Sequence, residues 1–268
     1  MKSTLLRRVV VVLAVVATIG VNGLANALPL NGLTTGEISD RFRVYFVPAG
    51  YVFSIWGLIY VGLILFAGYQ ALPAQRNNPR LERIGYLFAL SCGANGAWLF
   101  LWHYEQFPLT LIAMFSLLGL LIAIYLRLGI RRAAVSAGER WLVHLPFSIY
   151  LGWVSVATIA NVTSTLDYLK WGGWGIAPEL WAVIMLIVGV GIALAMSLTR
   201  GDVAYVLVLI WAYIGILIKH TSEDGFAGKY STVIGTVIAC LVVFLAAEAL
   251  ILVRRRRSPA LAAEAHIG

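Results

Sequence analysis

The sequence predicts an all-α polytopic membrane protein, a bundle of about eight transmembrane helices. Hydrophobic residues make up 61% of the 268 residues and charged residues only 12%, which is not the composition of a soluble domain. The apolar residues are gathered in eight long runs with short polar connectors between them. A bilayer-spanning helix needs about 20 such residues, so each run can form one.

The eight runs are expected to be helices because lipid offers no hydrogen-bond partner to the backbone. The alternating pattern of barrel strands is absent from the sequence. Cys92 and Cys240 both lie inside apolar runs and are expected to be packing residues. The runs cover residues 9–28, 48–72, 84–103, 108–128, 141–162, 178–198, 203–219 and 231–253.

The distribution of Lys and Arg predicts the orientation of the helices. With a cytoplasmic N-terminus, fifteen of the twenty Lys and Arg residues lie on the inner side. This bias follows the positive-inside rule and predicts that both termini are cytoplasmic, in a bacterial inner membrane. The run Arg254 to Arg257 is interpreted as an anchor near anionic lipid, so no nucleic-acid partner is expected. The outer residues are Arg41, Arg43, Lys170, Lys219 and Lys229.

The first segment permits two interpretations. Arg7 and Arg8, a short apolar core and the small residues around Asn26 resemble a signal peptide with a cleavage site. The segment is also long enough to remain as a helix, and Asn22 and Asn26, one turn apart, could then face other helices. Cleavage would leave seven helices.

Aromatic and amide residues share single faces of three predicted helices. Phe53, Trp56 and Tyr60 follow at i, i+3 and i+7 on the second, after Pro48 in its first turn. One face of the third helix carries Asn95, Trp98 and Trp102. One face of the fifth helix carries Tyr150, Trp153, Ala157 and Asn161.

These faces lie at one depth, in the outer half of the membrane, beneath the long connector 29–47. Aromatic walls with a few polar groups are typical of a pocket for a flat, largely apolar ligand. The alternative is an aromatic belt at the membrane interface, but the two asparagines do not fit it, because an unpaired amide is costly in the membrane. The connector itself is either a lid or a plain linker.

Small residues in the third helix predict a close helix contact. Cys92 and Gly96, and Gly93 and Ala97, are each four residues apart, which lets two backbones approach. The Gly93/Ala97 face serves either a homodimer or an intramolecular contact.

The stretch from Pro48 to Tyr60 resembles the second-helix motif of the tryptophan-rich sensory protein / translocator protein (TspO/MBR) family. Asn95-Gly96-Ala97-Trp98 is similar to the family's third-helix motif, and the stretch from Trp153 to Asn161 to its fifth-helix pattern. Ala49 stands where the family usually has a second proline, and the first loop is longer. The resemblance covers about residues 9–165, and the last three segments have no counterpart in the five-helix family.

The resemblance implies a membrane receptor or sensor that binds porphyrin, haem-related or sterol-like molecules, with a pocket among helices one, two, three and five. It implies a tetrapyrrole as ligand and no required cofactor, and it favours a homodimer. The predicted units are a five-helix binding bundle at 1–165, three additional helices at 166–257 and a cytoplasmic tail at 258–268. The binding unit is expected to be complete without the three additional helices.

Two other functions are weighed against ligand sensing. A transporter of the repeat type would show two similar halves, and no copy of the 48–60 motif occurs in the second half. An enzyme that degrades bound porphyrin, with an indole as reactive group, is only an extension of the resemblance. The sequence has no zinc-protease, serine-hydrolase or phosphate-binding motif, which points away from catalysis. Polar residues on the outer side could bind a metal or haem, but loop positions explain them equally well: His103, Glu105, His220, Glu223 and Asp224.

Overall fold

The computed structural model describes residues 2–28 and 30–257, so the expected tail at 258–268 lies outside the described residues. Eight helices in the described part are long and apolar enough to cross a membrane. This confirms the prediction of an all-α membrane bundle with eight spans. Their bounds are Leu5–Ala25, Gly50–Ala71, Pro79–His103, Phe107–Leu128, Ala137–Tyr168, Pro178–Arg200, Val203–Thr221 and Ser231–Val253.

Short elements connect the long helices. The long helices are α1 (Lys2–Ala27), α3 (Ile55–Ala71), α4 (Pro79–His103), α5 (Phe107–Leu128), α7 (Leu145–Tyr168), α8 (Pro178–Arg200), α9 (Val203–Thr221) and α10 (Ser231–Arg257). The short ones are α2 (Thr35–Asp40), α6 (Ala137–Glu139), a π-helical turn at Arg140–His144, and 3-10 turns at Leu30–Gly32, Gly50–Ser54, Pro73–Gln75 and Gly173–Gly175.

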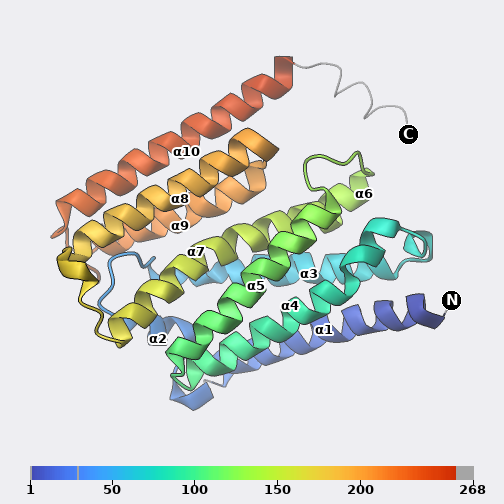
Figure 1. Cartoon of the computed structure of the whole chain (residues 1–268), viewed down its shortest axis with the longest axis horizontal. Helices are drawn as coiled ribbons and strands as arrows, with labels where there is room; N and C mark the ends of the chain where they lie inside the picture. Colours follow the sequence, from blue (N-terminus) through green and yellow to red (C-terminus); the bar gives the residue numbers. More distant parts are fainter. Residues whose placement is uncertain (1, 29, 258–268) are drawn as a thin grey trace.

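The helices form two groups that meet along α7 and α9. In the first group α4 packs against α1 and α5, α7 packs against α3 and α5, and α1 packs against α3. In the second group α8, α9 and α10 pack against one another, and they form a separate layer in Figure 1. The start of α1 and the end of α10 lie at the same end of the molecule. We call this the terminal end and the opposite end the loop end.

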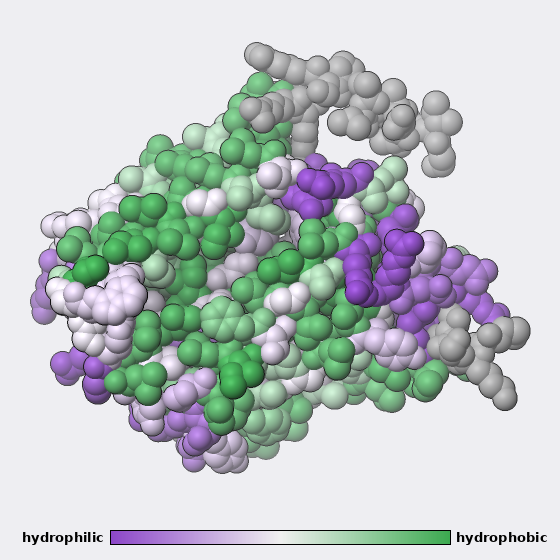
Figure 2. Space-filling view, viewed as in Figure 1, coloured by the Kyte–Doolittle hydropathy of each residue, from purple (hydrophilic) through white to green (hydrophobic). Residues whose placement is uncertain are grey.

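The outer surface is that of a protein surrounded by lipid. Figure 2 shows apolar residues across the middle of the visible face, between polar residues at both ends. Large side chains such as Ile112 (67% exposed) and Leu198 (60% exposed) lie on this surface. In a soluble protein such an area would be an interaction site. Here it is the area that faces the acyl chains of the bilayer.

A buried carboxylate joins the two helix groups. Gly201 ends α8 with φ +59°, and Asp202 then caps α9 by accepting the backbone N–H of Tyr205. The same carboxylate accepts hydrogen bonds of 2.7 Å from the hydroxyls of Tyr125 on α5 and Ser148 on α7. Three helices therefore share one acceptor, which is only 2% exposed.

The second span begins later than the sequence predicts. Pro48 was expected in the first helical turn, but the 3-10 turn starts at Gly50 and α3 at Ile55. Ala49 is extended, with φ −59° and ψ 147°, and its N–H donates to the carbonyl of Gly215 on α9. A contact with a distant helix thus holds the backbone out of the helical conformation.

Candidate functional site

A small cavity lies at the loop end, between α3, α4, α5 and α7. Its volume is about 40 Å³. Nine of the eleven residues predicted from sequence line it, and Thr35 and Ser39 of α2 close it on the loop side. The nine are Pro48, Phe53, Trp56, Asn95, Trp98, Trp102, Trp153, Ala157 and Asn161.

The other two predicted residues, Tyr60 and Tyr150, stand outside the lining. Each contacts Trp56 instead, Tyr60 in a stacked pair at 5.6 Å and Tyr150 edge-to-face at 5.9 Å. Tyr60 lies about 10 Å further along the helix axis than Phe53, at 1.5 Å per residue. It shares the face of Phe53 but not the depth of the cavity.

Indole and phenyl rings form two sides of the cavity. On one side Trp153 meets Phe53 at 5.8 Å and Trp56 at 6.3 Å, both edge-to-face. On the other side Trp98 and Trp102 are stacked at 5.5 Å. Such walls suit a flat apolar molecule, which gains contact area against ring faces.

The two asparagines predicted from sequence differ in how fully they are bonded. Asn161 accepts from the indole N–H of Trp98 at 3.2 Å and donates to the hydroxyl of Thr110 at 2.8 Å. The carbonyl of Asn95 accepts from the amide of Asn22 on α1 at 2.9 Å. Asn22 thus faces α4, as its position in the first segment suggested, whereas the side chain of Asn26 lies outside the described part.

Two buried N–H donors at the cavity lack a close acceptor. Among the side chains that the structure describes, the indole nitrogen of Trp153 meets no acceptor, and the amide nitrogen of Asn95 makes only a long contact with the hydroxyl of Tyr150. Asn95 is 0% exposed and Trp153 2% exposed. A buried donor without a partner costs about 1–3 kcal/mol. Both residues line the cavity, so a ligand with an acceptor at its edge would remove this cost.

A comparison with protein families identifies the chain. The model of the TSPO-like protein family matches residues 8–250. This protein belongs to the TSPO-like family. Comparisons with curated proteins and with solved structures gave no match. The family match runs past residue 165 and takes in α8, α9 and most of α10, for which the sequence motifs offered no counterpart.

Membership places this TSPO-like protein among membrane sensor and binding proteins in general. The two loop-end histidines are buried in it. His103 is 0% exposed, and its two ring nitrogens lie 3.1 Å from the hydroxyl of Thr35 and 3.0 Å from the carbonyl of Leu30. His220 is equally buried, with Nε2 2.9 Å from the carbonyl of Tyr45, whereas its Nδ1 has no hydrogen-bond partner among the described residues. In the described residues no three His, Cys, Asp or Glu side chains gather closely enough to hold a metal ion.

The α2 helix of this TSPO-like protein is fixed by a capping box. The hydroxyl of Thr34 accepts the backbone N–H of Glu37, whose carboxylate accepts the backbone N–H and hydroxyl of Thr34. These bonds, the backbone one first, hold the pKa of Glu37 below its usual value. The cap sets the register that presents Thr35 and Ser39 to the cavity. Their part in the lining was missed from sequence, although the Thr34–Glu37 spacing signals the helix start.

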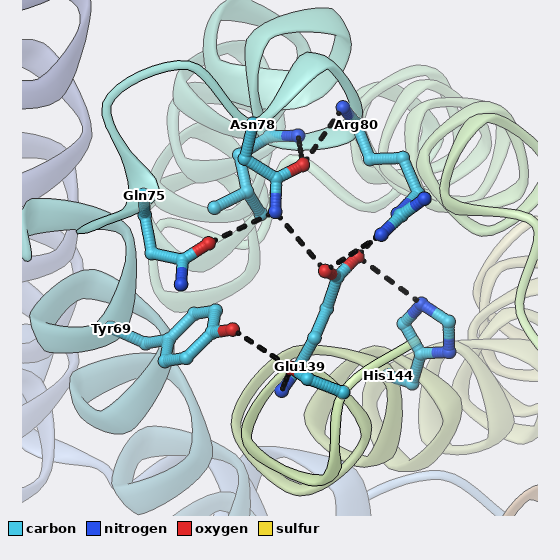
Figure 3. Close-up of polar contacts among 8 residues, drawn as sticks. Tyr69, Gln75, Asn78, Arg80, Glu139 and His144 are labelled. Carbon is cyan, nitrogen blue, oxygen red and sulfur yellow. Dashed lines mark hydrogen bonds and ion pairs between the residues drawn. The ribbon is translucent and has the colours of Figure 1, made fainter. Parts of the chain in front are cut away.

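A second polar cluster closes the terminal end of the first helix group (Figure 3). The carboxylate of Glu139, 2% exposed, lies 2.5 Å and 3.0 Å from two guanidinium nitrogens of Arg80 and accepts from the amide of Asn78 at 3.1 Å. His144 is also buried, with a ring nitrogen 3.9 Å from Glu139. The cluster ties the start of α4 to the start of α7 and lies at the opposite end from the cavity.

A larger groove of about 390 Å³ lies between α3, α7 and α9. Its walls are almost entirely apolar, and the indole N–H of Trp211 within it is bonded to the carbonyl of Val52. No unpaired donor of the described residues opens into it. Its chemistry suits acyl chains of the bilayer, and we place the candidate site in the smaller cavity because the unpartnered N–H of Trp153 is there.

The Gly93/Ala97 face of α4 is exposed on the helix surface. A Cβ built at Gly93 would meet nothing within 4 Å. The face is therefore not used by a contact inside the chain, and the homodimer stays a prediction.

Proposed function

We propose that this TSPO-like protein is a membrane receptor or sensor that binds a porphyrin or a related tetrapyrrole in the aromatic cavity. The unpartnered indole N–H of Trp153, with the weakly bonded amide of Asn95 beside the same cavity, carries the proposal. A tetrapyrrole combines flat apolar faces, which suit the indole walls, with polar edge groups that accept hydrogen bonds. A sterol-like ligand shares the apolar body, but its single hydroxyl would satisfy fewer of these donors.

The size of the cavity adds a condition to this function. Sites for ligands of this kind usually measure about 300–1,000 Å³, whereas the cavity holds about 40 Å³. Binding must therefore be accompanied by an outward movement of at least one wall. We expect association slower than the diffusion limit, as in other complexes that need a conformational change.

The direct test is a spectral titration. Purified protein in detergent is titrated with protoporphyrin and with haem, and both the absorption spectrum and the tryptophan fluorescence are recorded. We expect saturable spectral shifts and quenching at one ligand per chain, because Trp56 and Trp153 line the site. Changes that grow linearly with ligand and match those given by detergent alone would contradict the proposal.

We also propose that the terminal end faces the cytoplasm, from the fifteen-to-five division of Lys and Arg. The eight helices then place both termini inside and the cavity in the outer half of the bilayer. Reporter fusions after Gly268 and within the 169–177 connector are expected to report a cytoplasmic and an external position respectively. An external reporter after Gly268 would exclude this orientation.

A further inference from the structure

Helix α9 of the second group, together with Tyr230 next to α10, holds one wall of the cavity. We call residues 45–54 the loop-side wall, since Pro48 and Phe53 within it line the cavity. This wall lies along α9. The backbone N–H of Ala49 donates to the carbonyl of Gly215 at 3.0 Å, and the indole N–H of Trp211 donates to the carbonyl of Val52 at 3.1 Å.

The closeness of this contact depends on a glycine. Gly215 is buried in α9, and a Cβ added to it would lie 2.1 Å from Cγ2 of Val52 and 3.1 Å from Cβ of Pro48. Real Cβ atoms do not approach other carbon atoms to 2.1 Å, so any larger residue would displace the side chain of Val52 and press against Pro48. The absence of a side chain at Gly215 lets the wall backbone reach the helix backbone.

Further bonds hold the wall at its other end. The hydroxyl of Tyr45 donates to that of Tyr230, next to α10, at 3.0 Å, and a ring nitrogen of His220 lies 2.9 Å from the carbonyl of Tyr45. The ammonium of Lys219 also pairs with Asp40 at 2.8 Å. From residue 40 to residue 52, the polar anchors of the loop are thus supplied largely by the second helix group.

The preceding part of the loop is held by α4 instead. The indole N–H of Trp102 donates to the carbonyl of Thr35 at 3.2 Å, and the amide of Asn31 donates to the carbonyl of His103 at 3.0 Å. The cavity therefore lies beneath a segment that is fixed to both helix groups. Outward movement of this segment requires release from one of them.

We propose that α9 is the anchor that keeps the cavity closed, and that release of the loop-side wall from Gly215 and Trp211 admits the ligand. The identity of the ligand in this inference rests on the proposed function, whereas the release of the loop-side wall rests on the contacts with α9 alone. The inference gives α9, one of the last three helices, a role in binding. The sequence analysis expected them to pack beside a binding unit complete at residue 165.

The test makes the same two substitutions, Gly→Ala and Trp→Phe, once at the contact between α9 and the loop-side wall and once away from it. Gly215→Ala and Trp211→Phe weaken the anchor. Gly235→Ala and Trp181→Phe are the matched controls: a Cβ at Gly235 would meet nothing within 4 Å, and Trp181 bonds the carbonyl of Gly173 at 3.0 Å, away from the cavity. Thermal melting first establishes that each variant is folded, and Trp211→Phe carries the test if Gly215→Ala does not fold.

Hydrogen–deuterium exchange of residues 45–54 measures release without any ligand. We expect exchange to be about fivefold faster in Trp211→Phe, because the net contribution of one hydrogen bond, about 1 kcal/mol, corresponds to that factor. We expect a larger increase in Gly215→Ala. The controls are expected to remain within about twofold of the parent. Exchange in both anchor variants equal to that of the controls would overturn the inference.

The ligand arm uses protoporphyrin and stopped-flow fluorescence. If release limits access, association and dissociation both become faster by the factor seen in exchange. Faster exchange with unchanged protoporphyrin kinetics would overturn the role of α9 in access. Faster exchange in a protein whose parent form binds no protoporphyrin would support the anchor and contradict the proposed function, so the two failures are distinguishable.

Discussion

Trp153→Ala is expected to weaken protoporphyrin binding about thirtyfold. Truncating an aromatic anchor at the centre of a site commonly costs about 2 kcal/mol or more, and about 1.4 kcal/mol is a factor of ten. Trp153 is 2% exposed, and its ring meets both Phe53 and Trp56. The substitution removes a ring face and a free N–H donor together. The measurement is the fluorescence titration described above. The variant Trp153→Phe, which keeps a ring and loses the N–H, then separates the contribution of the ring face from that of the hydrogen-bond donor.

Two controls make this result specific. Trp171→Ala removes the same side chain from a cluster with Trp174 and Trp181, outside the cavity lining, and is expected to leave affinity unchanged. Melting temperatures are compared as well, because a Trp→Ala change in a packed site can cost about 3–5 kcal/mol of stability. Parent-like affinity in folded Trp153→Ala and Trp56→Ala proteins would mean that these rings serve helix packing alone.

The helices and their shared aromatic faces could be predicted from sequence because the membrane imposes strong local rules. A run of about 20 apolar residues must form a helix in lipid, since its backbone has no other partner. All eight predicted segments correspond to helices. The shared face of Asn95, Trp98 and Trp102 follows from helix periodicity, and all three line the cavity.

Contacts between distant segments had no such local signal. The sequence around Gly215 does not indicate that the loop near Pro48 lies against it. The two segments are more than 160 residues apart in the chain and meet only in the folded structure. Hydrophobic periodicity gives the face of a residue, but it does not fix its depth against neighbouring helices, which is why Tyr60 and Tyr150 share the predicted faces and yet stand outside the cavity lining. The acceptor role of Asp202 was missed for the same reason: its partners come from α5 and α7.

Asp202 is the residue whose loss should destabilise the fold most clearly. Its carboxylate accepts from the hydroxyls of Tyr125 and Ser148 and caps α9. Asp202→Ala removes the cap, worth about 1 kcal/mol. It also leaves two buried hydroxyls without an acceptor, at about 1.5–3 kcal/mol for each bond to a charged group. The sum is about 4 kcal/mol or more.

At about 2–4 °C per kcal/mol for a chain of this size, Asp202→Ala is expected to lower the melting temperature in detergent by about 10 °C. Asp202→Asn keeps one acceptor oxygen and should show a smaller decrease. Asp224→Ala removes an exposed carboxylate and should melt like the parent. In the double variant Tyr125→Phe with Ser148→Ala the hydroxyls are already gone, so adding Asp202→Ala should then cost only the cap. An undiminished decrease in that background would show that Asp202 stabilises the junction of the two helix groups through other contacts.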